Sequence, residues 1–558
     1  MLPGGMMDFP LTLPAILERA GKLFAHVEVV SGRPDKSLVR HTYGDIYRRA
    51  RQLAAALQNA GIRAGDRVAT LMWNHSTHLE AYFGVPACGA VLHTLNLRLH
   101  PAELAYIANH ARDRFLIVDD VLLPVLETFR ADCAFERILV VPFPGQPRAT
   151  AAPWESGYEE FLRSAPDKFA YPEIAEAQGA SMCYTSGTTG KPKGVLYSHR
   201  ALVLHSFAAC LADAFAFSEH DVVMTVGSMF HANGWGFPYA ATMAGSKQVL
   251  PGPHVDGESL LNLLEGEQVT FASGVPTLWV AVLDALDKNP GRWKLAPRLR
   301  IISAGSAVPE FLFRRLDAHG VRVVQAWGMT ETSPIATIAN LSPDTARRDE
   351  EQRYAARVRQ GRTLPFVEIR ATDDEEQEIA WDDRTLGELQ VRGPWVAGQY
   401  FEMPEADDRW TIDGWFRTGD VVSIDARGSI RIADRSKDLI KSGGEWISSV
   451  DVENALMAHP AVKEAGVIGV PHPKWQERPL AVVVLRDGAQ ADPSALREFL
   501  LKSFAKWQVP DAFVYVKALP RTSVGKVLKR KLREDFQDWK WDSEADGKRK
   551  DARSAAEG

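Results

Sequence analysis

The sequence predicts an α/β protein: a large N-terminal domain of layered α/β subdomains, a small antiparallel, barrel-like β subdomain, and then a small mobile α+β C-terminal domain. Three observations lead to this fold class. The 558 residues exceed what one hydrophobic core normally supports. Apolar strand-like segments alternate with helical patterns, which is typical of parallel sheets covered by helices. After about residue 385, short alternating strands with turn glycines replace this pattern.

The elements of the first domain follow in order along the chain. Residues 43–61 place Ile46, Ala50, Leu53 and Leu57 on one helical face, and this helix is expected to end near Gly61. A second helix is predicted over residues 309–320. Apolar runs predict strands at residues 67–73, 115–120, 137–143, 221–230, 299–307 and 321–328. The small sheet is predicted from residues 387–393, 414–425 and 428–434, and the acidic stretch 371–384 is expected to be a solvated hairpin or loop.

These patterns predict three parts of the chain. Residues 1–434 form the N-terminal domain, and residues 435–540 form the C-terminal domain. Residues 541–558 are charged and rich in Gly and Ala, and are expected to be a disordered tail.

Composition narrows the class of protein. Apolar residues at 46% and charged residues at 24% describe an ordinary globular protein, and a net charge of -6 gives no reason to expect a nucleic-acid partner. The four cysteines show no paired spacing, so neither disulfides nor a zinc site is expected. The first residues lack the basic region of a signal peptide, and no apolar run reaches the length of a membrane span. The expected location is the cytoplasm.

The segment YTSGTTGKPKGV, residues 184–195, is the first candidate site. Its glycines, hydroxyls and two lysines, Lys191 and Lys193, suit an anionic ligand, and it follows an apolar run that ends a strand. Its spacing does not match the G-x-x-x-x-G-K-[ST] loop of P-loop NTPases. A simple Gly/Ser/Thr connector is the alternative from composition alone.

Five further segments follow in order: SAGSAVP (303–309), WGMTET (327–332), GWFRTGD (414–420), DRSKDLIKSGGEWIS (434–448) and PRTSVGK (520–526). With YTSGTTGKPKGV, this series resembles the acyl-adenylate-forming superfamily, which includes acyl-CoA synthetases, adenylation domains of peptide synthetases and beetle luciferases. The resemblance covers nearly the whole chain. Within the superfamily, GGEWIS and MFHANGWGFPYAA (229–241) are similar to the bacterial medium- and long-chain fatty-acid–CoA ligases.

The resemblance implies how the chain binds ATP and magnesium. Glu331 would hold Mg²⁺, a cation that prefers oxygen ligands, together with Thr188. Asp420 would accept the ribose hydroxyls, with Arg435 reaching the ribose or a phosphate. The remaining residues implied in nucleotide binding are Thr185, Ser186, Gly187, Thr188, Thr189, Gly190, Lys193, Gly305, Trp327, Gly328, Met329 and Thr330.

The resemblance also implies two half-reactions that use different parts of the second domain. Lys526 would bridge the acid and the α-phosphate while the acyl-adenylate forms. The second domain would then rotate about Lys437 and bring Lys441, Gly444 and Trp446 to the site for coenzyme A. A narrow passage beside Gly444 would exclude a Cβ atom, although a simple turn at this glycine is equally compatible with the sequence.

The acid site is implied by residues 229–241. His231 would lie beside the acyl carbonyl and act in catalysis with Lys526, Glu331 and Thr188. Trp235 would border the acyl tunnel, with Gly305 on the substrate side, and a core aromatic is the alternative for this tryptophan. Because no fixed charge marks this segment, an apolar monocarboxylic acid is favoured over an amino acid or a dicarboxylate.

The sequence thus predicts an AMP-forming acyl-CoA synthetase, an acid–thiol ligase that uses ATP, Mg²⁺, coenzyme A and a medium- or long-chain fatty acid. A homodimer without nucleic-acid or integral membrane partners is expected. An aryl acid or a short thioether acid such as methylthiopropionate remains open, as does a non-catalytic nucleotide- or acyl-binding protein. A carrier-protein thiol or molecular oxygen as acceptor, and a serine hydrolase using Ser186, are less well supported.

Overall fold

The computed structural model describes residues 4–142, 153–166, 168–185, 191–442, 445–522 and 526–541, with the side chains of all but residues 405 and 407. The chain divides into two compact units. Unit 1 comprises Met1–Lys437 and Arg521–Lys526, and unit 2 comprises Asp438–Pro520 and Val527–Gly558. The short segment that ends at Lys526 is therefore part of unit 1.

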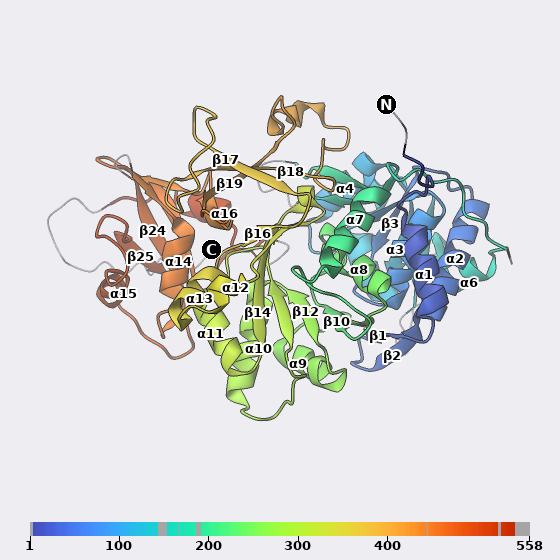
Figure 1. Ribbon diagram of the computed structural model, residues 1–558, viewed down its shortest axis with the longest axis horizontal. Coiled ribbons are helices and arrows are strands. Elements are labelled where there is room, and N and C mark those ends of the chain that lie inside the picture. The colour runs from blue at the N-terminus through green and yellow to red at the C-terminus, as the bar shows by residue number, and fades with distance from the viewer. Residues whose placement is uncertain are drawn as a thin grey trace. The chain divides into compact units, whose positions relative to one another are not determined.

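Two large, mainly parallel sheets form the frame of unit 1 within the described residues (Figure 1). The nine-stranded sheet is parallel at its centre and antiparallel at β1/β2, β14/β15 and β15/β16. Its order is β16 (Arg362–Thr363), β15 (Ile335–Ile338), β14 (Arg322–Gly328), β13 (Arg300–Ser303), β12 (Phe271–Gly274), β10 (Val222–Thr225), β11 (Lys247–Leu250), β1 (Glu28–Gly32) and β2 (Leu38–Thr42).

The second sheet of unit 1 has seven described strands and is antiparallel only between β8 and β9. Its order is β7 (Glu155–Gly157), β6 (Arg137–Val141), β5 (Asp113–Asp119), β3 (Arg67–Leu71), β4 (Val91–Thr94), β8 (Gly179–Tyr184) and β9 (Gly194–Ser198). The strands predicted at 67–73, 115–120, 137–143, 221–230, 299–307 and 321–328 are all present, as β3, β5, β6, β10, β13 and β14.

Helices fill three layers around these sheets. One shared core joins the facing sides of the two sheets through α1 (Leu13–Leu23), α2 (Tyr43–Asn59), α3 (Ser76–Ala87), α7 (His199–Cys210) and α8 (Phe237–Ala244). The four residues predicted on the buried face of α2 are all fully buried. The outer face of the nine-stranded sheet is covered by α9 (Gly257–Gly266), α10 (Pro276–Lys288) and α11 (Glu310–Ala318). The outer face of the seven-stranded sheet is covered by α4 (Pro101–Ala111) and α5 (Leu123–Glu127).

The remaining part of unit 1 is an antiparallel sheet of four described strands, β17 (Glu368–Thr372), β18 (Gly387–Arg392), β19 (Phe416–Ile424) and β20 (Ile430–Arg435). The acidic stretch between β17 and β18 is mainly exposed, as predicted. Shorter helices of unit 1 are α6 (Tyr158–Arg163), α12 (Pro343–Ala346) and α13 (Glu350–Arg357). The prediction of layered α/β subdomains with a small antiparallel one is confirmed.

Unit 2 is an α+β unit with its own apolar cores. Its five described strands run in the order β22 (Glu445–Ile447), β21 (Ile440–Ser442), β24 (Gln476–Leu485) and β23 (Val462–His472), with β25 (Ala512–Tyr515) parallel to β24. Its helices are α14 (Ser449–Met457), α15 (Pro493–Leu500) and α16 (Lys529–Asp535).

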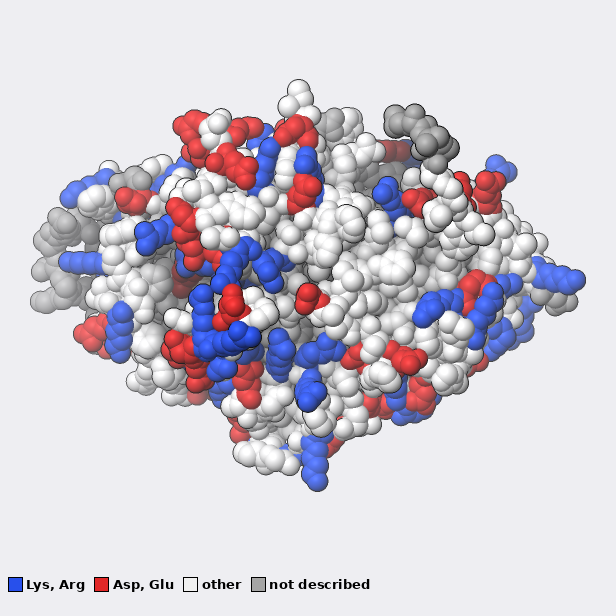
Figure 2. Space-filling model, viewed as in Figure 1, with Lys and Arg blue, Asp and Glu red and all other residues white. Residues whose placement is uncertain are grey.

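Charged side chains of both signs are interspersed on the face shown in Figure 2. Some charged side chains of the protein form exposed pairs: Arg314 lies 2.6 Å from both Glu310 and Glu351. Exposed pairs of this kind contribute little to stability, about 0–1 kcal/mol each. No helix among the described ranges is both long and apolar enough to cross a bilayer.

Candidate active site

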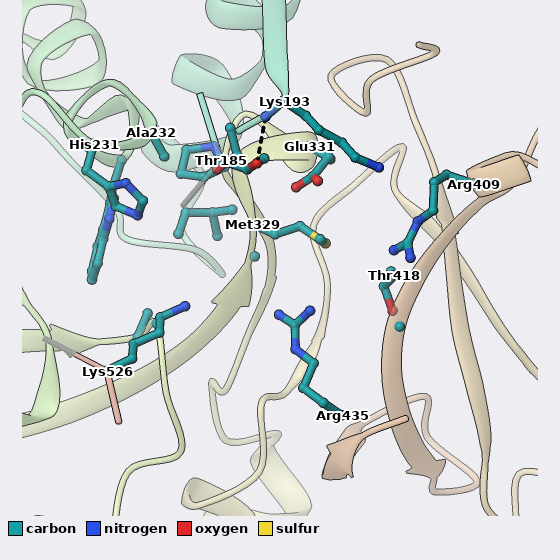
Figure 3. A pocket seen from close by; sticks show the side chains of 18 of the residues that line it. Thr185, Lys193, His231, Ala232, Met329, Glu331, Arg409, Thr418, Arg435 and Lys526 are labelled. Carbon is teal, nitrogen blue, oxygen red and sulfur yellow. Dashed lines mark hydrogen bonds between the residues drawn. The ribbon is translucent and has the colours of Figure 1, made fainter. Parts of the chain in front are cut away.

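A cavity of about 350 Å³ lies in unit 1, where segments far apart in the sequence meet (Figure 3). The loop between β8 and β9, the turn after β10, the ends of β13 and β14, and the β19–β20 sheet all contribute side chains. Lys526, from the Arg521–Lys526 segment, lines the same cavity. Parallel strands direct their carboxyl ends to one edge of a sheet, which is where α/β proteins place their binding sites.

The loop of residues 184–195 is closed at its base by the two strands that carry it. The Thr185 backbone N–H donates to the Lys193 carbonyl at 2.9 Å, and the Lys193 N–H donates to the Thr185 hydroxyl at 3.1 Å. Thr185, Lys191 and Lys193 line the cavity. The Lys193 ammonium lies 4.7 Å from the centre of the Tyr400 ring, an arrangement that holds the cation in place by cation–π attraction. Ser186, Gly187, Thr188, Thr189 and Gly190 lie outside the described residues.

Glu331 is a buried carboxylate held in place by neighbouring groups. It lies on a 3₁₀ turn, Thr330–Thr332, that follows β14. The Tyr400 hydroxyl donates to Glu331 Oε1 at 2.6 Å, and the Ala397 N–H donates to the Glu331 carbonyl at 2.7 Å. The strand end before it requires glycine, since a Cβ on Gly328 would lie 1.9 Å from the Pro334 carbonyl oxygen.

The surroundings of Glu331 bear on whether the site could hold a magnesium ion. Among the described residues, no group of three or more His, Cys, Asp or Glu side chains could enclose a metal ion. A magnesium ion in a nucleotide site is commonly held by one or two carboxylates plus substrate phosphates. A single fixed carboxylate such as that of Glu331, in a cavity lined mainly by basic side chains, is compatible with this mode of binding.

Asp420 and Arg435 are neighbours on β19 and β20 and form an ion pair with a 2.6 Å distance between Arg435 Nε and Asp420 Oδ1. The Trp327 Nε1–H donates to the other carboxylate oxygen at 2.8 Å. Asp420 is almost completely buried, so this pairing fixes its orientation. Each carboxylate oxygen has a second lone pair, which leaves acceptors for two hydroxyl groups of a ligand.

His231 precedes an unusual backbone turn that contains Trp235. The five residues from Ala232 to Gly236 all have positive φ angles, between 36° and 74°. A left-handed conformation costs roughly 1–2 kcal/mol for each residue that is not glycine, so surrounding packing must hold this turn in place. Burial and the nearby charges of Lys526 and Arg98 lower the pKa of His231 to about 4. The imidazole is thus neutral at pH 7 and can accept or donate a hydrogen bond.

Lys526 is a half-buried lysine whose charge depends on its surroundings. Desolvation, and then the nearby Arg435, lower its pKa to about 8, while Asp420 and Glu331 oppose this shift. Its Cε lies 3.6 Å from the place where a Cβ of Gly305 would be, and Gly305 has a φ of +91°. A side chain at Gly305 would therefore be strained and would contact the lysine.

The cavity is strongly cationic. Its described lining contains one carboxylate, that of Glu331, against six basic side chains: Lys191, Lys193, Arg409, Arg435, Lys437 and Lys526. The Arg409 Nε–H is buried and has no hydrogen-bond partner among the described residues. Such an excess of donors and positive charge suits a polyanion such as a triphosphate.

The structure brings most of the predicted site residues together. Twelve of them line the cavity: Thr185, Lys193, His231, Trp235, Gly305, Gly328, Met329, Thr330, Glu331, Arg435, Lys437 and Lys526. Asp420 accepts a hydrogen bond from Trp327 and pairs with Arg435. Lys441 and Trp446 lie in unit 2, where the ammonium is 4.4 Å from the centre of the indole ring. Gly444 lies outside the described residues.

Tyr400 and Arg409 are cavity residues that the sequence did not point to. They lie between β18 and β19, in a segment without a recognisable motif, so only the fold reveals them. Lys191, one of the two lysines that suit this loop to an anionic ligand, also lines the cavity.

Comparison with known proteins shows the family of the chain. A model of the AMP-binding enzyme family matches residues 18–401, and a model of the AMP-binding enzyme C-terminal domain matches residues 451–526. The chain is 50% identical to a long-chain-fatty-acid–CoA ligase of Thermus thermophilus, over 96% of this chain and 98% of that protein. It is 44% identical to a 3-methylmercaptopropionyl-CoA ligase of Ruegeria lacuscaerulensis, over 96% of this chain and 99% of that protein.

Solved structures show the same architecture. The anthranilate CoA ligase AuaEII, solved in complex with anthranoyl-AMP, matches with a TM-score of 0.83 and 26% identity, over 94% of this chain and 98% of that one. ATP-bound MatB from Rhodopseudomonas palustris matches with a TM-score of 0.78 and 27% identity, over 95% of this chain and 99% of that one. From the matched models, the close relatives and the shared fold, we conclude that this chain belongs to the AMP-binding enzyme family.

Proposed function

We propose that the protein is an AMP-forming acyl-CoA synthetase that joins a carboxylic acid to coenzyme A in two steps. ATP first gives an acyl-adenylate and pyrophosphate, and the coenzyme A thiol then displaces AMP to form a thioester. One observation carries the proposal. The cavity is lined by many basic side chains and by residues from both ends of the 184–195 loop. It also contains a neutral histidine, His231, and a lysine of unusually low pKa, Lys526.

Electrostatics supports the first step. An acid carboxylate must approach the α-phosphate of a polyanion, so like charges repel. A Lys526 ammonium between them would attract both groups, and each contact at ~4 Å contributes on the order of 4 kcal/mol at an effective dielectric of ~20. Because its pKa is about 8, Lys526 carries this charge at neutral pH. Thr185 and Lys193 would bind the outer phosphates, and Asp420 the ribose hydroxyls.

Magnesium is expected to accompany ATP. When bound, it would neutralise part of the phosphate charge. Glu331 would hold it, and the Tyr400 hydroxyl would keep the carboxylate oriented.

The acid is proposed to be apolar, and a medium- or long-chain fatty acid is the first choice. The uncharged residues that line the cavity include Ala232, Trp235, Val275 and Ala304. Relatives at 50% and 40% identity are named for long-chain and medium-chain fatty acids, and one at 44% identity is named as a 3-methylmercaptopropionyl-CoA ligase. An aryl or short thioether acid is therefore the alternative.

For the second step, Lys441, Gly444 and Trp446 are proposed to bind coenzyme A, and Lys437 to act as the hinge. The boundary between the two units falls directly after Lys437, which supports this choice. A cytoplasmic location, expected from the dispersed cysteines, and a homodimer, expected from the family resemblance, are part of the same proposal.

The direct test measures AMP release by the purified protein with ATP, Mg²⁺, coenzyme A and a panel of C2–C18, aryl and thioether acids. AMP release that depends on acid and coenzyme A, greatest for fatty acids, is expected. ADP in place of AMP, or no acid dependence, would contradict the proposed reaction. A preference for aryl or thioether acids would replace only the proposed substrate.

A further inference from the structure

A buried polar cluster underlies the left-handed turn between His231 and Trp235. Its centre is Asn233, which is 1% exposed. The Ser181 hydroxyl donates to Asn233 Oδ1 at 2.8 Å, and Asn233 Nδ2 donates to the Thr94 hydroxyl at 3.2 Å. The Asn233 backbone N–H donates to Cys183 Sγ at 3.1 Å. Thr94, Ser181 and Cys183 are all buried as well, so water cannot replace these bonds at no cost.

The side chains bonded to Asn233 lie on β4 and β8, and β8 leads into the 184–195 loop. Ser181 and Cys183 belong to β8, which ends at Tyr184 and continues into the 184–195 loop. Thr94 ends β4, the neighbour of β8, and its hydroxyl donates to the Phe230 carbonyl at 3.3 Å, just before His231. The cluster thus ties the backbone on both sides of His231 to the strand that leads to the phosphate loop.

The choice of residue also fits the backbone. Asn233 has φ 36° and ψ 56°, in the left-handed region. Asparagine tolerates this region better than other residues with a side chain. Alanine there would lose both the bonds and the favourable conformation, whereas glycine would lose only the bonds.

We infer that Asn233 is a positioning residue that fixes the acid-binding turn against β8, so that the acid and the triphosphate are held in register for adenylate formation. This inference rests on the proposed function. It assigns no contact between Asn233 and a substrate. A small displacement of the acid relative to the α-phosphate would slow the first step much more than the second, in which the acyl group is already bonded to AMP.

The test compares the two half-reactions in Asn233→Gly. Acid-dependent ATP–pyrophosphate exchange reports adenylate formation, and thioester formation from supplied acyl-adenylate reports the second step. Dodecanoate and its adenylate are the probes, replaced by the fastest acid of the panel if the wild type prefers another. We expect kcat/KM for the acid in exchange to fall about 10–100-fold, with KM for ATP and the second step changed by less than about threefold.

Two further variants separate positioning from loss of folded protein. Thr94→Val removes one partner of Asn233 with little change of shape, and a smaller loss of about three- to tenfold, confined to the first step, is expected. Gln248→Ala is the matched control, because this buried amide donates to Tyr43 Oη and Thr242 Oγ1, both at 2.9 Å, and to the Pro238 carbonyl at 3.4 Å. It donates to none of the five residues of the turn, 232–236. This variant is expected to lower thermal stability and leave the ratio of the two half-reactions unchanged.

The outcomes are distinguishable. Equal losses in both half-reactions, or unchanged exchange in Asn233→Gly and Thr94→Val, would overturn the positioning role while the wild type still forms an adenylate. The same selective loss in Gln248→Ala would also overturn it. A wild type that forms no adenylate with any acid would instead remove the proposed function, and the inference with it.

Discussion

Burial lowers the pKa of Lys526, and this predicts how the first half-reaction depends on pH. Its pKa of about 8 lies below that of an ordinary lysine, so its ammonium is charged below pH 8 and loses its proton as the pH rises above that value. We expect adenylate formation, measured by pyrophosphate exchange, to decline as the pH rises through about 8. In Lys526→Arg, which stays charged at these pH values, any remaining activity should lack this decline. If exchange by Lys526→Arg declined over the same pH range, the decline would belong to a group other than Lys526.

Removal of the lysine gives a second prediction at the scale of one residue. Lys526→Ala should lower the exchange rate by about 10²–10³-fold, since removal of one preorganised charge or donor commonly has this effect. Thioester formation from supplied acyl-adenylate should be retained. Lys531→Ala is the control, because Lys531 is exposed on α16 and pairs only with the neighbouring Asp535 in the described residues. Loss of both half-reactions in Lys526→Ala would contradict the assigned role.

Tyr400 affects the site through Glu331. Tyr400→Phe keeps the ring beside Lys193 and removes only the hydroxyl that donates to the carboxylate. The Mg²⁺ concentration for half-maximal activity is expected to rise about tenfold, as for other residues that orient a metal ligand. An unchanged Mg²⁺ titration would show that Glu331 needs no such support or holds no metal.

At the scale of elements, the end of β14 depends on close backbone contact. A Cβ at Gly328 would lie 1.9 Å from the Pro334 carbonyl oxygen, so β14 and the Glu331 turn could not both keep their places. Gly320, just after α11, differs from Gly328: its φ is positive, at 75°, but a Cβ there would meet no atom within 4 Å. Gly320→Ala should therefore cost about 1–2 kcal/mol of unfolding free energy, and Gly328→Ala clearly more. Thermal unfolding of both variants tests this order, and equal midpoints would contradict it.

At the scale of the whole molecule, the chain has two units with separate cores. It first passes from unit 1 to unit 2 directly after Lys437, and it returns to unit 1 only for Arg521–Lys526. If the second half-reaction requires rotation about Lys437, a proline there should hinder it, because its ring fixes φ. Lys437→Pro is expected to retain adenylate formation and to lose at least about 90% of thioester formation from supplied acyl-adenylate. Single-turnover assays of each step provide the measurement. Parallel losses in both steps would speak against a hinge at this residue.

The sequence by itself determined the fold class, because helices and strands each repeat their apolar residues at a characteristic spacing, which can be read over a short stretch of chain. The apolar face of α2 and the strands β3, β5 and β14 follow directly from the spacing of apolar residues. The sequence also pointed to Glu331, Asp420 and Lys526 as candidate site residues, since each lies in a motif shared with the family that the chain resembles.

Only the tertiary structure decided which side chains share a cavity and which protonation state they have there. Tyr400 and Arg409 lie in a segment without a motif, yet the fold places them beside Lys193 and Gly419. The neutral His231, the low pKa of Lys526 and the bonds of Asn233 likewise depend on burial and on partners far away in the chain. Local pattern cannot report such properties, because desolvation and Coulomb interaction depend on distance in space, and the fold alone sets that distance.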